Sequence, residues 1–173
     1  MHPLLDTLLT GSSSRPFALL AREGTGTLEV LLGDVVDVEL LADIPLVDAS
    51  GTPLEVLALV PFRQVRERGF ESHDDGEPLR CLIVREREEV PLAVAMAALP
   101  HDEVPLHDGH FDVSDDDYAQ TVRDVIQNEI GRGEGANFVI RRDFTARVDA
   151  DPRTAALSWL HALLTHERGA YWT

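Results

Sequence analysis

The sequence contains no lysine: its 15 basic residues are all arginine, and they face 31 aspartates and glutamates. The resulting net charge of -16 repels phosphate groups, so binding to nucleic acid or to an anionic membrane is disfavoured. Cysteine is also scarce. Because Cys81 is the only one, an internal disulfide is excluded. Cys81 lies in a short apolar run, which favours a buried structural thiol over a nucleophile.

Long hydrophobic runs are missing as well. No apolar run approaches the roughly 20 residues that a membrane-spanning helix needs. The N-terminus carries Asp6 and lacks a basic stretch ahead of an apolar one, so a signal peptide is not indicated and we expect a cytoplasmic chain. With 173 residues, 44% of them hydrophobic, the chain can form one domain, or part of a larger one, with a sizeable core.

Apolar spacing and turn residues predict a mixture of helices and strands. Helices are expected over residues 4–9, 91–99, 114–132 and 152–168. Strands are expected over residues 17–21, 28–32, 34–41, 54–60, 79–84 and 136–148, and a further strand begins at residue 171. Residues 63–78 and 101–110 read as loops. The alternation alone fits both an α+β and an α/β fold.

The helix over residues 114–132 has the strongest signals. Ser114 is a good N-cap, and Asp117 follows three positions later, as in a capping box. Apolar residues then recur on one face: Tyr118, Val122, Val125, Ile126 and Ile130. Gly131 and Gly133 are expected to end the helix.

The segment Gly131-Arg132-Gly133-Glu134-Gly135 has glycines spaced as in a phosphate-binding loop. Such a loop should follow a strand and open a helix, whereas here a helix precedes and a strand is expected to follow. Glu134 would also repel phosphate. A helix stop is therefore the favoured interpretation.

Several acidic and histidine residues could form a metal site. The candidates are His101, His107 and His110 with Asp102, Glu103 and Asp108, and more weakly His73-Asp74-Asp75. Their spacings match no established ligand pattern, so solvated loops are favoured. His161 and His166 lie near the C-terminal end of a predicted helix, where a partial positive charge is mildly favourable without any function. No G-x-S-x-G motif points to a hydrolase.

Residues 129–142 read EIGRGEGANFVIRR and are extended by DFTAR over residues 143–147. This stretch resembles the segment that opens the chorismate-binding domain in the anthranilate synthase component I family of chorismate-utilising enzymes. Residues 169–173, after a leucine-rich helix, look like the next landmark. Upstream, residues 41–46 and 57–70 add to the match. Within the family, the sequence is most similar to 2-amino-2-desoxyisochorismate synthases, which include the phenazine-pathway enzyme.

The resemblance implies an α+β fold, a mostly antiparallel sheet with outer helices that forms part of an anthranilate-synthase-type fold. Residues 1–112 would be the N-terminal region of the synthase, and residues 113–173 the incomplete start of the chorismate-binding core. The family's synthase domain is much longer than this chain. Exposed sheet edges are therefore expected, with poor stability alone or tight pairing with a partner, either the missing C-terminal synthase part or a second copy in a homodimer.

The resemblance also implies a reaction. Ammonia, or water in some members, attacks C2 of chorismate as the C4 hydroxyl leaves, and Mg²⁺ holds the substrate carboxylate. Water-adding members carry a lysine base on a strand at the position of Asn137, whereas ammonia-using members carry an amide. An amide cannot deprotonate water but can orient an amine. Asn137 thus implies ammonia, supplied by a glutamine amidotransferase domain or subunit. The alternative is an ordinary strand residue facing a polar pocket.

The comparison with the family also reveals departures. Tryptophan-regulated anthranilate synthases carry a Leu-Leu-Glu-Ser motif, where this chain has Leu19-Leu20-Ala21-Arg22, so tryptophan feedback is in doubt. The family's magnesium-binding glutamates, general acid/base histidine and carboxylate-gripping arginine belong to later segments and are not carried over here. Three hypotheses stay open: part of an ammonia-dependent synthase of secondary metabolism, a truncated or non-catalytic fragment or interaction module, and, last, an unrelated acidic binding domain.

Overall fold

The computed structural model describes residues 2–167, 169 and 171–173. The chain divides into two compact units. The first contains Met1–Leu99 and Leu160–Thr173, and the second contains Pro100–Trp159. This division does not bear on the boundary expected after residue 112, which concerns parts of a whole synthase and stays a prediction.

The first unit is built on a five-stranded antiparallel sheet with the order β3-β4-β2-β1-β7. Its strands are β1 (Phe17–Arg22), β2 (Thr27–Val38), β3 (Val56–Leu59), β4 (Leu79–Pro91) and β7 (Tyr171–Trp172). The predicted hairpin is confirmed, because β1 pairs with β2 through a tight turn. The strand predicted to begin at Tyr171 is confirmed too, and its preceding residue Ala170 lies outside the described residues. The α+β fold with a mostly antiparallel sheet is thus confirmed.

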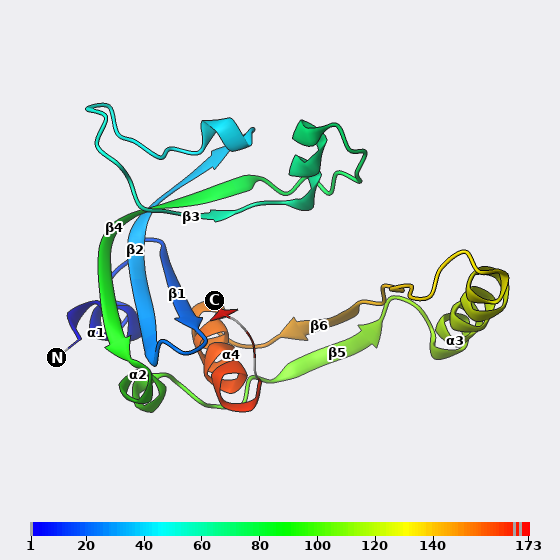
Figure 1. The fold of residues 1–173 in the computed structure, drawn as a ribbon. Coiled ribbons are helices and arrows are strands. Elements are labelled where there is room, and N and C mark those ends of the chain that lie inside the picture. The colour runs from blue at the N-terminus through cyan, green and yellow to red at the C-terminus, as the bar shows by residue number, and fades with distance from the viewer. Residues whose placement is uncertain (1, 168, 170) are drawn as a thin grey trace. The chain divides into compact units, whose positions relative to one another are not determined.

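A β-bulge bends the two longest strands. Leu32 pairs with Glu86 and the next residue, Gly33, pairs with Val84, so Arg85 has no partner across the sheet. A Cβ atom on Gly33 would lie 1.9 Å from the carbonyl oxygen of Ile83, so only glycine fits here. Figure 1 shows β2 and β4 curving together through this region.

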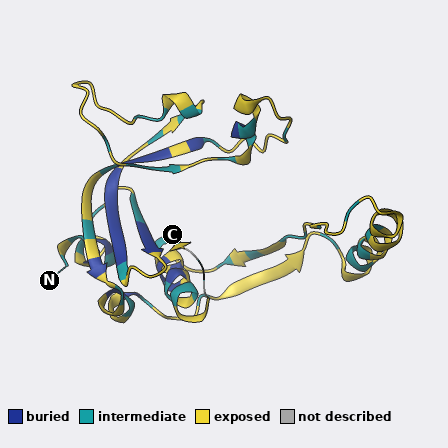
Figure 2. Ribbon diagram, in the orientation of Figure 1, coloured by how far each residue is buried: buried dark blue, intermediate teal, exposed yellow. Residues whose placement is uncertain are grey.

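Two short helices complete the core of the first unit. Both α1 (Pro3–Leu9) and α2 (Leu92–Ala98) pack against β2 and β4. Leu5 and Leu8 of α1 are 1% exposed, so this face of α1 is fully removed from water. The Glu88 carboxylate accepts hydrogen bonds from the backbone amides of Leu4 and Leu5, at 3.0 and 3.2 Å, and thereby satisfies the open N-terminus of α1. Figure 2 shows the buried stretches of β1, β2 and β4.

Cys81 lies on β4 and is fully buried, as expected for a structural thiol. It pairs across the sheet with Val36 on one side and Ala58 on the other. Burial, with a smaller contribution from the charge of Asp37, raises the pKa of this thiol. We therefore expect Cys81 to react slowly with thiol reagents in the folded chain.

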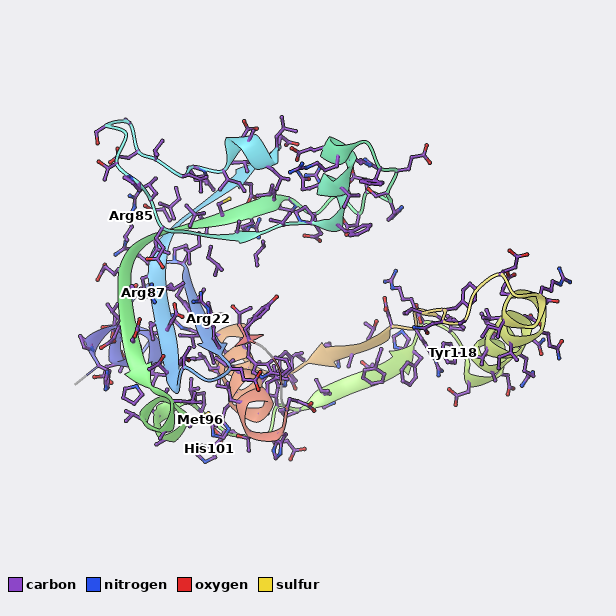
Figure 3. All side chains as sticks on the ribbon, in the orientation of Figure 1. Arg22, Arg85, Arg87, Met96, His101 and Tyr118 are labelled. Carbon is purple, nitrogen blue, oxygen red and sulfur yellow. The ribbon has the colours of Figure 1, made fainter. Side chains whose placement is uncertain are left out.

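Glu29 is the one carboxylate buried in the sheet among the described residues. Its two oxygens contact Arg22 at 3.2 Å and Arg87 at 3.0 Å, from the neighbouring strands β1 and β4. Figure 3 labels both arginines beside the sheet. A buried charge needs such partners, because leaving water without them is costly. This ion triplet ties three adjacent strands together.

Replacing Glu29 by alanine is expected to lower the free energy of unfolding by about 2 kcal/mol. A fully buried pair would lose more, but the side chains of Arg22 and Arg87 are 55% and 39% exposed and can regain water. Urea denaturation followed by circular dichroism measures the change. Glu89→Ala is the matched control: Glu89 also contacts Arg87, at 2.9 Å, but is 57% exposed, so its loss should cost well under about 1 kcal/mol. Equal effects of the two substitutions would contradict the role of burial.

Residues 63–78, predicted as a loop, contain a 3-10 helix over Phe62–Arg68. Gln64 of this helix is buried and donates to the backbone oxygen of Glu39 and to Glu67, at 2.9 and 2.6 Å. Glu67 in turn accepts a hydrogen bond from the backbone amide of Leu41. The loop prediction was wrong here because these bonds join segments far apart in sequence, which local patterns do not reveal.

The second unit contains a two-stranded antiparallel ribbon, β5 (Leu106–Phe111) with β6 (Phe144–Val148). The loop predicted over residues 101–110 is therefore wrong for its second half. The strand predicted over residues 136–148 is right only for 144–148, because β5 offers no partner to the residues before Phe144. The helix α4 (Pro152–His166) forms where it was predicted. No helix in the described part of the chain is long and apolar enough to cross a membrane.

The helix predicted over residues 114–132 forms in three pieces. It begins as α3 (Asp115–Asp124), continues as a π-helical turn (Val125–Glu129) and ends as a 3-10 turn (Ile130–Arg132). Ser114 caps it as predicted, because its hydroxyl accepts the amide of Asp117 at 3.1 Å. Gly133 follows with a φ of +80°, the left-handed conformation that stops helices.

Arg142 joins the ribbon to the start of α3 within the second unit. Its guanidinium lies 3.9 Å from the centre of the Phe111 ring and 5.3 Å from that of Tyr118. It also donates to the backbone oxygen of Val113 at 2.9 Å and pairs with Asp115. A planar guanidinium can stack on a ring and donate sideways at the same time, which lysine cannot do.

Replacing Arg142 by alanine is expected to destabilise the second unit by about 2 kcal/mol, through the loss of ring stacking and two hydrogen bonds. Arg142→Lys should restore only part of this. Hydrogen exchange of the α3 amides, read by mass spectrometry, reports the change. Arg141→Ala is the control, since Arg141 is 83% exposed and pairs with Asp143 nearby, and it should change exchange little. Unchanged α3 exchange in Arg142→Ala would contradict the role assigned to Arg142.

Candidate functional site

A hollow of about 240 Å³ lies in the second unit between the α3 helix, with its two following turns, and the chain after Gly135. It contains Asn137, the residue that the sequence singled out. The remaining lining residues are Tyr118, Val122, Val125, Ile126, Ile130, Ala136, Phe138 and Ile140. The predicted apolar stripe of the helix thus forms one wall of the hollow.

Asn137 lies on irregular backbone and not on a strand, which corrects the expectation of a strand here. The chain reverses at Gly133, and Phe138 folds back toward Gly135, where a Cβ atom would come within 2.9 Å of the ring. These two glycines allow the chain to return along the helix. The side chain of Asn137 is exposed, so its amide is open to a further molecule.

The lining of the hollow at Asn137 has few polar groups. Tyr118 and Asn137 are the lining residues with polar side chains, and none of the described lining residues carries a charge. The amide of Asn137 can donate two hydrogen bonds and accept two, enough to orient a small amine. A dicarboxylate would need cationic partners that this hollow does not supply.

A π-helical turn forms part of the same wall. Val125 and Ile126 belong to this turn and line the hollow, and Ile126 is 53% exposed. Single π turns within helices are frequent at functional sites. No local sequence signal identified this turn.

The histidines proposed as metal ligands are distributed along the ribbon and its approach. His107 and His110 lie on β5, where His107 is 3.6 Å from Asp149 and His110 contacts the backbone oxygen of Asp108 at 2.9 Å. Within the described residues, no group of three or more His, Cys, Asp or Glu side chains converges on a common point. Asp74 of the weaker candidate pairs instead with Arg66, at 3.0 Å.

The other sequence candidates have structural roles. Gly131–Gly135 follows a helix, and the backbone amides of Gly133 and Glu134 close onto the helix end at 3.0 Å each, as a helix stop requires. Leu19-Leu20-Ala21-Arg22 forms most of β1: its first three residues are buried and Arg22 holds Glu29.

Comparison with known proteins gives two close matches. The chain is 47% identical over 163 residues to a phenazine-specific anthranilate synthase of Pseudomonas chlororaphis, and 45% identical over 163 residues to that of Pseudomonas fluorescens. Each match covers 91% of this chain but 26% of the relative, so the chain spans about a quarter of the curated relatives it matches. No family model matches. The resemblance read from the sequence is confirmed: this chain is a relative of phenazine-specific anthranilate synthases.

Proposed function

We propose that this chain is part of an ammonia-dependent synthase that converts chorismate to 2-amino-2-desoxyisochorismate or anthranilate in secondary metabolism. The observation that carries the proposal is the 45–47% identity to two phenazine-specific anthranilate synthases over 91% of the chain. The chain would supply one wall of the active site, and the part of the synthase that it does not cover would supply the rest.

Asn137 is the residue assigned to nucleophile positioning. A carboxamide holds an amine by accepting its N–H and leaves the lone pair free to attack carbon. It cannot remove a proton from water, and the sequence offers no lysine to do so. The exposed amide of Asn137, in a hollow whose other lining residues are apolar except Tyr118, supports this assignment because it is accessible to an amine.

The residues described here do not fit a magnesium centre. The hollow at Asn137 contributes an amide and a phenol but no carboxylate, and Mg²⁺ prefers carboxylate and water oxygens. Magnesium, which the family resemblance implies, is therefore assigned to the part of the synthase outside this chain.

Ammonia would come from a glutamine amidotransferase domain or subunit of the same synthase.

We further propose that tryptophan does not regulate the synthase. At the positions of the polar Glu-Ser pair, this chain has Ala21 and Arg22, and Arg22 is engaged by the buried Glu29 at 3.2 Å. The polar groups of the regulatory motif are therefore replaced by a methyl group and a paired cation.

A second candidate function is a non-catalytic fragment or interaction module that acts only in a complex. The uncharged lining of the hollow favours it, because a chorismate dianion has no cationic partner there. The two candidates share the need for a partner and differ in whether that complex turns over chorismate.

Chorismate consumption tests the proposal. The chain is assayed with chorismate, magnesium and ammonium salt, first alone and then with the uncovered part of the Pseudomonas chlororaphis relative expressed separately. Turnover in the mixture, without turnover by the chain alone, supports a shared active site. Turnover by the chain alone overturns the assignment of an incomplete site, and a stable complex without turnover favours the interaction module.

A further inference from the structure

A second hollow, of about 410 Å³, lies in the first unit beside the edge strand β3. Its lining comes from both edge strands of the sheet: Ala58 and Leu59 from β3, and Tyr171 from β7. Val60, Pro61, Glu77, Pro78 and Arg80 complete it. The two strands at opposite ends of the sheet order thus border the same space.

The hollow combines exposed large apolar side chains with the charged residues Glu77 and Arg80. Leu59, Val60 and Tyr171 are 58%, 51% and 62% exposed. Phe62, which follows the lining residue Pro61 in the sequence, is 76% exposed. The lining cation, Arg80, is held by both oxygens of Asp37 at 2.8 and 2.9 Å. Exposed clusters of large apolar side chains are typical of surfaces that bind another chain.

The backbone of β3 is open along the same edge. The Glu55 carbonyl accepts the amide of Val84 at 2.9 Å, so in an antiparallel pair Leu57 and Leu59 also direct their backbone groups toward β4. Val56 and Ala58 therefore direct theirs away from the sheet. Within the described residues, β3 pairs with β4 alone. An open edge of this kind accepts an added strand.

We propose that an extended segment from the part of the synthase that this chain does not cover adds to the free edge of β3. Its backbone would pair with Val56 and Ala58, and its apolar side chains would contact Leu59 and Tyr171. This inference rests on the proposed function, because it takes the chain to be part of a longer synthase.

Two observations select this occupant over a second copy. The chain spans 26% of the length of its relatives, so about three quarters of such a synthase is available to supply the segment. Two copies of this chain would each carry a net charge of -16 and repel one another.

Binding of the remaining synthase part tests the proposal. The chain is titrated with the uncovered part of the Pseudomonas chlororaphis relative, and the dissociation constant is measured by sedimentation. Leu59→Glu places a charge in the hollow, and Ala58→Pro removes an amide that points away from β4. Each is expected to weaken binding at least about ten-fold. Val47→Glu is the control, since Val47 is 56% exposed in the same unit but does not line the hollow.

Hydrogen exchange supplies a second readout that does not depend on folding of the variants. In the wild-type complex, the amides of Val56 and Ala58 should exchange at least about ten-fold more slowly than in the free chain. Unchanged exchange at these two amides, equal binding by all variants, or no complex with the wild type overturns the proposal. Self-association of the chain that Leu59→Glu abolishes would overturn it in favour of a second copy.

The same complex separates this inference from the proposed function. If the wild-type complex turns over chorismate and Leu59→Glu binds the remaining synthase part as tightly as the wild type, the docking inference fails while the proposed function stands. Protection of β3 without turnover means that the docking inference stands while the catalytic proposal fails.

Discussion

Gly33→Ala is expected to destabilise the first unit more than any other substitution considered for this chain. The added methyl carbon would lie 1.9 Å from the Ile83 carbonyl oxygen and 2.8 Å from its carbon, far inside van der Waals contact. Both atoms belong to the backbone of a central strand, so no flexible side chain can move aside. The expected loss is about 4 kcal/mol, a large share of the roughly 5–15 kcal/mol that stabilises a typical domain.

Cys81 provides a direct measurement of this loss. The thiol is buried on β4 and its pKa is raised by burial, so a disulfide reagent at pH 8 should react slowly with the wild-type chain. In Gly33→Ala the reaction should be at least about 100-fold faster than in the wild type, because a loss of about 4 kcal/mol raises the population of the open form by more than that factor. Circular dichroism during urea denaturation gives the same change as a free energy.

Gly131→Ala is the matched control for this substitution. Gly131 is outside the left-handed region, and its nearest backbone neighbour, the carbonyl oxygen of Ile126, would lie 3.2 Å from the new carbon. A shift of a few tenths of an ångström accommodates that contact, so the change should stay within about 1 kcal/mol. A wild-type urea midpoint for Gly33→Ala would contradict the close approach of β2 and β4 at the bulge.

Asn137→Ala is expected to lower ammonium-dependent chorismate turnover about 100-fold in the reconstituted complex. The amide would no longer orient the amine, and misplacement of a nucleophile costs rates of this order. The effect should fall on turnover at saturating chorismate, because Asn137 is assigned to the nucleophile and not to the dicarboxylate. Initial rates over a range of ammonium and chorismate concentrations separate the two.

Two further variants sharpen the test of Asn137. Asn137→Gln keeps a carboxamide and should recover most of the activity, as the amide usual in ammonia-using members implies. Asn128→Ala removes the same side chain from the π-helical turn, where Asn128 contacts Arg132 at 3.4 Å and does not line the hollow. Wild-type turnover in Asn137→Ala, or equal losses at both asparagines, would remove Asn137 from the active site.

Local patterns by themselves determined most of the secondary structure. The Ser114 cap, the apolar stripe that follows it and the glycine stop at Gly133 are interactions within a few residues, so the sequence states them directly. The β1–β2 hairpin and the α4 helix were predicted for the same reason. The resemblance of the segment around Asn137 to chorismate-utilising enzymes can also be recognised from the amino-acid sequence alone.

The tertiary structure decided the features that depend on residues distant in sequence. The strand predicted to run from residue 136 begins only at Phe144, because a strand exists only where another strand accepts its hydrogen bonds. The 3-10 helix at Gln64 depends in the same way on a backbone oxygen 25 residues away. Such partners are invisible to periodicity.

The same division holds for the two hollows. The sequence identified Asn137 and the helix stripe, but only the reversal of the chain at Gly133 brings them together. No local pattern indicates that Leu59 and Tyr171, 112 positions apart, line one space, because they lie on strands at opposite ends of the sheet order. Composition and local spacing determined what each segment can form, and packing between segments decided where their side chains meet.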